Sequence, residues 1–173
     1  VRERHMGYSR ATDALMEEAI ARLKSLGAVI VDPTNIPNTG KYDDAEFEVL
    51  LYEFKADLDA YLRGLESSRV RSLAGVIAFN REHAAEEMPY FGQEIMEMAQ
   101  AKGPLTSAKY RAARAKCVAL TRAGGIDAEM KRHRLDALIA PTQAPAWLID
   151  LVNGDPGGIG GFTSPAAVAG YPH

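Results

Sequence analysis

The sequence predicts a helix-rich chain of the α/β class that contains few strands. Several long segments repeat apolar residues at helical spacing, whereas only two short apolar runs have the length of buried strands. Two strands alone do not make a stable sheet. We therefore expect residues 1–173 to form a single partial domain, cut from a larger fold at both ends.

The first helix is predicted over residues 9–27. Ser9 or Thr12 can cap its start, and Gly27 can adopt the left-handed conformation that ends a helix. Its expected apolar face comprises Leu15, Ala19, Leu23 and Leu26. The β-branched run AVIVDP that follows, at 28–33, is predicted to be a strand.

The middle of the chain is predicted to be almost entirely helical. A long helix is expected over 43–65, followed by helices over 72–88 and 92–103 and a longer one over 106–134. Glycines 124 and 125 favour a kink within the last of these. The apolar stripe of the 43–65 helix should comprise Phe47, Leu50, Leu51, Phe54, Leu58, Tyr61 and Leu62.

The last part of the chain combines a predicted strand, a loop and the start of a helix. LDALIAPT, at 135–142, is an apolar run of strand length that Pro141 ends. A loop should follow, and Ser164 before Pro165 is predicted to be the N-cap of a final helix.

Composition excludes several classes of protein. The net charge of −3 offers no basic face for nucleic acid, and no apolar run approaches the ~20 residues needed to span a bilayer. The single cysteine, Cys117, excludes a disulfide framework within the chain and favours the cytoplasm. We expect neither nucleic acid nor a membrane as a partner.

No motif completes a catalytic, phosphate or metal site. The glycine-rich loop at 154–161 lacks the lysine of a phosphate-binding loop and does not follow a strand directly, so a surface loop is the simpler interpretation. His83 and Glu87 share a helix face without a third ligand, so no metal site is expected.

Several stretches, taken together and in order, nevertheless resemble the amidase signature family. They are ATDALMEEAIARLKSLGAVIVDP, LLYEFKADLDAYL, AFNREHAAEEMPYFGQE, GPLTSAKYRAARAK, LDALIAPT with PAWLID, and TSPAAVAGYP. The resemblance covers nearly the whole chain. It implies the C-terminal portion of an α/β/α fold around a mixed sheet, without the GGSSGG-type serine signature and the catalytic lysine of the family.

The resemblance implies an enzyme that hydrolyses carboxamide C–N bonds by serine acyl transfer. A nucleophilic serine, a second serine on a cis peptide and a lysine carry out this chemistry, and none of them corresponds to a residue of this chain. We therefore expect the chain alone to be inactive and to contribute the walls of a pocket for a small-molecule amide. No metal or organic cofactor is implied.

The resemblance also indicates which residues line that pocket. Thr142 would lie at a strand end, where open α/β sheets place ligand contacts. Thr163 and Ser164 would form the wall beside the acyl part of the substrate, with the 154–161 loop as a mobile rim. Tyr90 and Gln93 would be second-tier pocket residues.

Two alternative functions remain open from the sequence. The first is the ammonia-releasing A subunit of an amidotransferase, and the second is a noncatalytic helical binding or assembly module. The two strand-like runs argue against the helical module because each needs sheet partners. Uncovered strand edges also lead us to expect that the isolated chain associates with itself.

Overall fold

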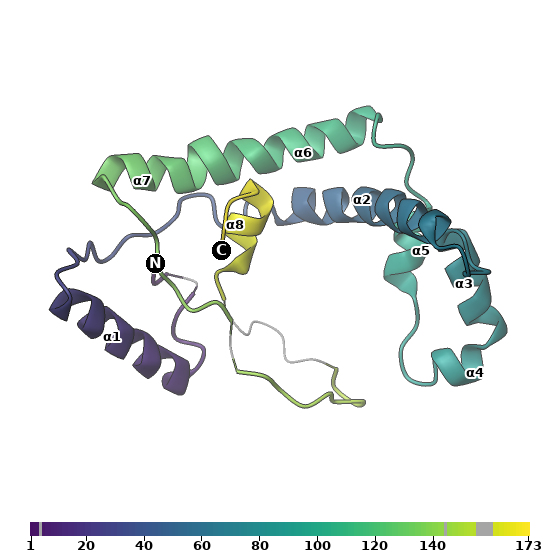
Figure 1. Cartoon of the computed structure of the whole chain (residues 1–173), viewed down its shortest axis with the longest axis horizontal. Coiled ribbons are helices and arrows are strands. Elements are labelled where there is room, and N and C mark those ends of the chain that lie inside the picture. Colours follow the sequence, from purple (N-terminus) through teal and green to yellow (C-terminus); the bar gives the residue numbers. More distant parts are fainter. Residues whose placement is uncertain (4, 144, 155–160) are drawn as a thin grey trace. The chain divides into compact units, whose positions relative to one another are not determined.

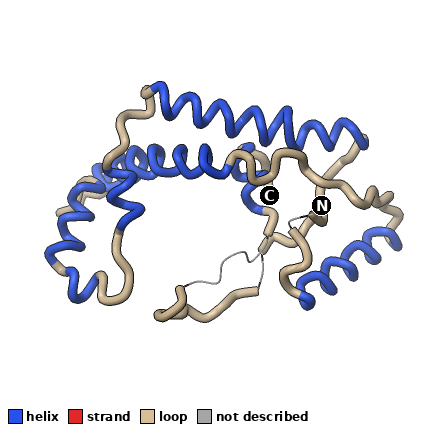
Figure 2. The backbone as a smooth tube through the Cα atoms, turned by 180° about the vertical axis from the view of Figure 1, so that it is seen from behind, coloured by secondary structure: helices blue, strands red, loops and turns tan. Residues whose placement is uncertain are grey.

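The computed structural model describes residues 1–3, 5–143, 145–154 and 161–173, and these residues form helices joined by loops (Figures 1 and 2). The elements are α1 (Arg10–Ser25), α2 (Asp43–Gly64), α3 (Leu73–Glu82), α4 (Ala84–Glu87), α5 (Glu94–Gln100), α6 (Ala108–Thr121), the π-helix η1 (Arg122–Ile126), α7 (Asp127–His133) and α8 (Thr163–Ala169). The expectation of a helix-rich chain with few strands is confirmed.

Neither run that was predicted to be a strand forms one. Both segments, 28–33 and 135–142, are non-helical, but neither pairs with a neighbouring strand among the described residues. The β-pairing seen in the described part of the chain is an isolated antiparallel bridge between Gln143 and Gly161. Local apolar patterning can favour an extended backbone, but a strand also needs a neighbour to accept and donate its hydrogen bonds.

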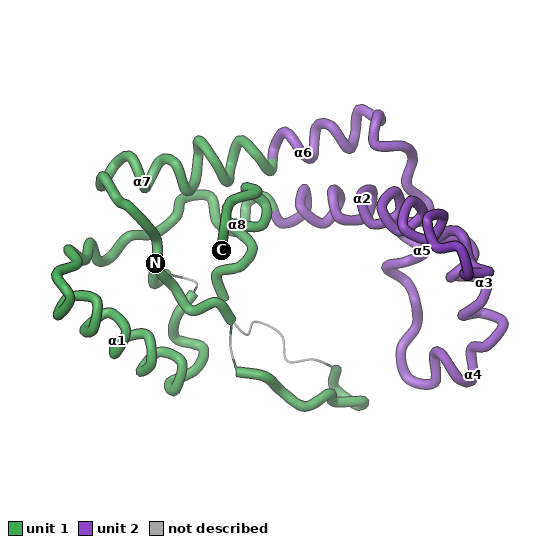
Figure 3. Tube along the Cα trace, viewed as in Figure 1, with its two compact units in different colours: residues 1–42, 117–173 green, residues 43–116 purple. Residues whose placement is uncertain are grey.

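The chain divides into two compact units (Figure 3). Unit 1 comprises Val1–Tyr42 and Cys117–His173, and unit 2 comprises Asp43–Lys116. The chain therefore passes from one unit to the other at the start of α2 and again within α6. The single domain expected over 1–173 therefore stays a prediction. No helix of the described ranges combines the length and the apolar character that crossing a membrane requires.

Unit 2 is held together by a small apolar core. α2, α3 and α5 contribute the buried side chains Leu51, Leu73, Ile77 and Ala99, against which Leu58 and Met96 pack. The start of α3 is fixed twice. The backbone N–H of Leu73 donates to Asp59 Oδ1 at 2.7 Å, and Ser72 Oγ accepts from the N–H of Gly75 at 3.2 Å.

An ion-pair cluster joins the start of α2 to the chain around α6. Glu48 forms salt bridges with Lys102 and Lys109, each at 2.9 Å. The hydrogen bond from Lys109 has the larger effect and that from Lys102 the smaller, and both lower the pKa of Glu48. Nearby, Lys55 donates to the carbonyls of Gln100 and Lys102 at 2.8 and 2.7 Å. Lys55 thus provides a partner for the carbonyl of Gln100, the last residue of α5, and for that of Lys102 beyond the helix.

Much of the predicted stripe of α2 remains uncovered by the described residues. Leu51 is buried, but Leu50 is 55% and Tyr61 is 64% exposed. Phe47 and Phe54 are each 40% exposed. The pattern is thus correct for a helix face, but the part of the stripe that packs in unit 2 is narrower than predicted.

The apolar face of α1 shows the same incomplete burial. Ser9 caps this helix and Gly27 follows it at φ 95°, as predicted. Of the expected face, however, Leu15 and Leu26 are each 67% exposed, and the buried residue of α1 is Ile20.

Two further helix predictions were wrong at their boundaries. The segment 72–88 is interrupted at His83, where α3 ends and the short α4 begins. The segment 92–103 is helical only from Glu94 to Gln100, so Gly103 lies beyond the end of α5. Helix ends depend on which terminal groups find partners, and periodicity does not report this.

The predicted break at the paired glycines is confirmed. η1 separates α6 from α7, and Gly125 leaves the helical conformation at φ −134° and ψ −107°. The kink between the two helices interrupts their regular backbone hydrogen bonds. Asn38 compensates, because its side-chain amide donates to the carbonyl of Gly124 at 2.7 Å.

Candidate functional site

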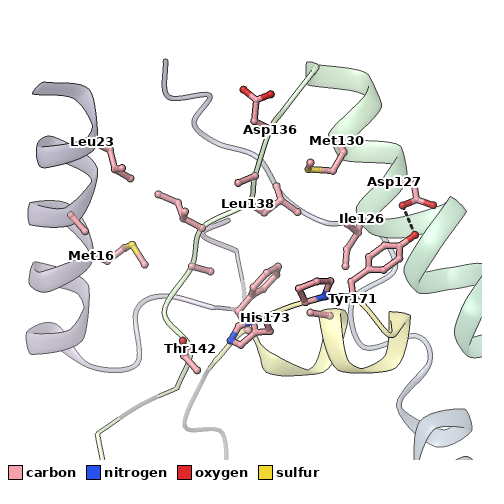
Figure 4. A pocket seen from close by; sticks show the side chains of 17 residues that line it. Met16, Leu23, Ile126, Asp127, Met130, Asp136, Leu138, Thr142, Tyr171 and His173 are labelled. Carbon is pink, nitrogen blue, oxygen red and sulfur yellow. Dashed lines mark hydrogen bonds between the residues drawn. The ribbon is translucent and has the colours of Figure 1, made fainter. Parts of the chain in front are cut away.

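A mostly apolar cavity of about 1100 Å³ lies within unit 1 (Figure 4). It is lined from α1, from η1 and α7, from the segment 136–142 and from the C-terminal residues. Met16 and Leu23 of α1 point toward the segment that carries Leu138. The labelled lining residues are Met16, Leu23, Ile126, Asp127, Met130, Asp136, Leu138, Thr142, Tyr171 and His173. Such a cavity suits a ligand that is largely apolar with a few polar groups.

Thr142, a predicted site residue, lines this cavity where two segments pair. The N–H of Phe162 donates to the carbonyl of Thr142 at 3.1 Å, and Gln143 forms its antiparallel bridge with Gly161. We call this pairing the 142–162 bridge. A Cβ at Gly161 would lie 2.7 Å from the Thr142 carbonyl oxygen, and φ there is 137°. Glycine is therefore required for this close approach.

The start of α8 differs from its prediction. The helix runs from Thr163 to Ala169 with Phe162 as its N-cap residue, and this residue forms no side-chain cap hydrogen bond. Ser164 is therefore the second helical residue and not the cap. The buried Phe162 is fixed by its backbone bond to Thr142, so the helix can begin directly after it. Thr163 is exposed and Ser164 is half-buried.

The end of α8 is held against the η1–α7 segment. Arg122 Nε donates to the carbonyl of Ala169 at 2.7 Å, and its guanidinium lies 5.2 Å from the centre of the Tyr171 ring. Tyr171 donates its hydroxyl to Asp127 Oδ1 at 2.8 Å, and this bond raises the pKa of the tyrosine. Sequence reasoning missed these contacts, since no local pattern links residues 44 or more positions apart.

The other two predicted site residues belong to unit 2. Tyr90 is 66% exposed in the loop between α4 and α5. Gln93 is half-buried, donates from Nε2 to the carbonyl of Ile77 at 3.2 Å and accepts from Asn80 Nδ2 at 3.1 Å. Its amide therefore ties the start of α5 to α3.

Of the predicted site residues, the structure brings together Thr142, Thr163 and Ser164 around the 142–162 bridge. Tyr90 and Gln93 belong to the other unit. The predicted rim loop at 154–161 lies mostly outside the described residues, which exclude 155–160.

Comparisons with known proteins identify relatives of this chain, although no family model matches it. A protein of Arabidopsis thaliana named "Probable amidase" is 36% identical over 141 residues, which are 79% of this chain and 27% of that protein. The crystal structure of a peptide amidase in complex with the competitive inhibitor chymostatin is 42% identical. It matches with a TM-score of 0.84 over 94% of this chain and 32% of that chain.

A second crystal structure gives the same result. Native peptide amidase from Stenotrophomonas maltophilia is 42% identical, with a TM-score of 0.79 over 91% of this chain and 31% of its own. The chain thus spans about a third or less of the length of these relatives.

The comparisons agree with the resemblance described from the sequence: over most of its length, this chain is homologous to proteins named amidase and peptide amidase. Its fold is that of roughly a third of a peptide amidase, and it forms a helix-rich part of an α/β fold.

Proposed function

We propose that this chain is the C-terminal portion of an amidase that hydrolyses carboxamide C–N bonds. The observation that carries the proposal is the match to peptide amidase, which combines 42% identity with a TM-score of 0.84 over 94% of the chain. A single match over nearly all of both units also supports our proposal that they belong to one domain. The relatives are amidases, and nothing in the chain favours an amidotransferase subunit or a helical binding module.

The chemistry proposed for the whole protein is serine acyl transfer. A lysine kept neutral by burial takes a proton through a bridging serine, and a second serine attacks the amide carbon. Backbone N–H groups stabilise the oxyanion, ammonia leaves and water releases the acid. The two serines and the lysine lie outside this chain, and no cofactor takes part.

The proposed substrate is a peptide carboxamide. Two of the solved structures similar to this chain are those of proteins named peptide amidase, and one of them is a complex with the competitive inhibitor chymostatin. Within unit 1, Thr142 lines the apolar cavity. Thr163 and Ser164, which are not among the residues that line it, begin α8 next to Phe162 and would extend this wall with small polar groups. Tyr90 and Gln93 remain proposed second-tier residues. We also propose a cytoplasmic location, because the single cysteine, Cys117, is a buried free thiol.

The isolated chain is proposed to be inactive and to associate with itself. Val29, in the segment after α1, is 91% exposed. Apolar side chains of α1 in unit 1 and of α2 in unit 2 are also exposed. Exposed apolar side chains of this kind favour association with other chains.

Ammonia release tests the proposed function. The full-length protein is expected to release ammonia from a peptide carboxamide, whereas the 173-residue chain at the same concentration releases none and elutes as an oligomer in light scattering. A full-length protein that leaves every tested carboxamide intact contradicts the proposal, and a monodisperse monomer of the chain contradicts its self-association.

Hydroxyl removal tests the proposed wall. In the full-length protein, Thr142→Val or Thr163→Val is expected to raise KM for the carboxamide about three- to tenfold, since each removes one hydrogen-bonding group of the same volume. Thr106→Val is the matched control at an exposed threonine of unit 2, and it should leave KM unchanged. If the wall variants behave like this control, the two threonines do not contact substrate.

A further inference from the structure

His5 is buried against residues that lie far away in the sequence. The residue is 6% exposed, and its Nδ1 atom lies 2.6 Å from the carbonyl oxygen of Gly161, 156 positions away. A carbonyl oxygen only accepts hydrogen bonds, so Nδ1 must carry the proton and donate it. The imidazole also meets the ring of Phe162 edge-on, with centroids 4.9 Å apart at 85°.

The backbone around His5 is itself fixed. The N–H groups of His5 and Met6 both donate to the carbonyl of Arg2, at 3.1 and 3.0 Å. Arg2 in turn forms a salt bridge with Asp32 at 2.7 Å and another with Glu17 of α1. These hydrogen bonds, the one with Asp32 most strongly, raise the pKa of Arg2. The two ion pairs fix Arg2, whose carbonyl in turn fixes the turn that carries His5.

The contacts of His5 converge on the 142–162 bridge. Gly161 accepts from the imidazole, and Phe162 contacts the ring and donates its N–H to Thr142. Thr163 begins α8 directly after these two residues. The hydrogen bond from His5 thus acts on the backbone that determines where both Thr142 and Thr163 lie.

We propose that His5 is a positioning residue of the amide site, which holds the 142–162 bridge so that Thr142 and Thr163 face substrate in a fixed geometry. The inference rests on the proposed function. His5 itself touches no reacting atom, and its effect passes through the Gly161 carbonyl. Loss of the bond should loosen the bridge and weaken substrate binding, without altering the serine and lysine chemistry.

Two substitutions separate hydrogen bonding from packing. His5→Phe keeps a ring beside Phe162 but removes the donor, whereas His5→Asn keeps an N–H group near the position of Nδ1 and removes the ring. Both are made in the full-length protein. The measurements are amide hydrogen exchange at Phe162, KM and kcat for a peptide carboxamide, and the melting temperature.

For His5→Phe we expect the Phe162 amide to exchange about three- to tenfold faster and KM to rise by a similar factor, with kcat within twofold of the original protein. His5→Asn should restore both values toward those of the original protein even if its melting temperature falls further. A purely structural role would instead move the melting temperature alone, or would affect the asparagine variant more strongly in all three measurements.

Each result decides the question. Unchanged exchange in His5→Phe overturns the inference because the bridge then does not depend on the bond. Faster exchange with unchanged KM shows that the bridge does not position substrate, which also overturns it. If the unsubstituted protein releases no ammonia, the proposed function fails, and the positioning role that rests on it is overturned as well. Hydrogen exchange at the Phe162 amide still reports, independently of activity, whether the hydrogen bond from His5 to Gly161 holds the bridge.

Discussion

Leu73→Ala is expected to lower the free energy of unfolding of unit 2 by about 3 kcal/mol. Leu73 is 0% exposed and packs in the core that α2, α3 and α5 share. Truncation removes apolar contacts and leaves a cavity, because the fixed start of α3 limits collapse around the site. The change in the free energy of unfolding is measured by urea denaturation of the 173-residue chain, with hydrogen exchange of the amides of unit 2 as the probe.

Leu50→Ala is the matched control on α2. This leucine is 55% exposed, so the same substitution should cost less than about 0.5 kcal/mol in this chain. Equal losses for the two variants would contradict the assignment of Leu73 to the core of unit 2.

Gly125→Ala is expected to destabilise unit 1 by about 2 kcal/mol. A Cβ at this position would lie 2.7 Å from the carbonyl oxygen of Leu120 and 3.6 Å from Cγ2 of Ile36. The first contact is with backbone, so η1 must shift to accept the methyl group, and the shift disturbs the adjoining cluster of Ile36, Ile126, Phe162 and Ala169. Denaturant unfolding of the same chain measures the loss.

Gly103→Ala provides the comparison at an open position. Among the described residues, apart from its two chain neighbours, no atom lies within 4 Å of a Cβ built there, so the substitution should change stability by no more than about 0.5 kcal/mol. A loss at Gly125 no larger than that at Gly103 would mean that the π-turn tolerates a side chain.

Local sequence patterns predicted the helices and their interruption. The spacing of Leu51 and Leu58 marks a helix face, and paired glycines at 124 and 125 mark the break between α6 and α7. Both features depend on residues within a few turns of one another. The extent of burial was not predictable, since Leu15 and Leu50 are as apolar as Leu73 but remain exposed.

Features that depend on distant partners were predicted poorly or missed. The runs at 28–33 and 135–142 have strand composition, but pairing is decided by other segments. Thr142 and Thr163 were proposed for one site from a family resemblance, and their proximity depends on the close approach at Gly161. His5 escaped notice because its acceptor lies 156 residues away.

The kink at Gly125 also sets the direction in which each face of α7 points. Each residue of an α-helix turns the chain by about 100°. If Gly125 adopted helical backbone angles, α6 and α7 would form one continuous helix, and the side chains of α7 would point in other directions. Ile126 and Met130 would then leave the cavity, and Asp127 would turn away from Tyr171. The glycine pair, together with the hydrogen bond from Asn38 to the Gly124 carbonyl, therefore determines which face of α7 meets the chain's C-terminal residues.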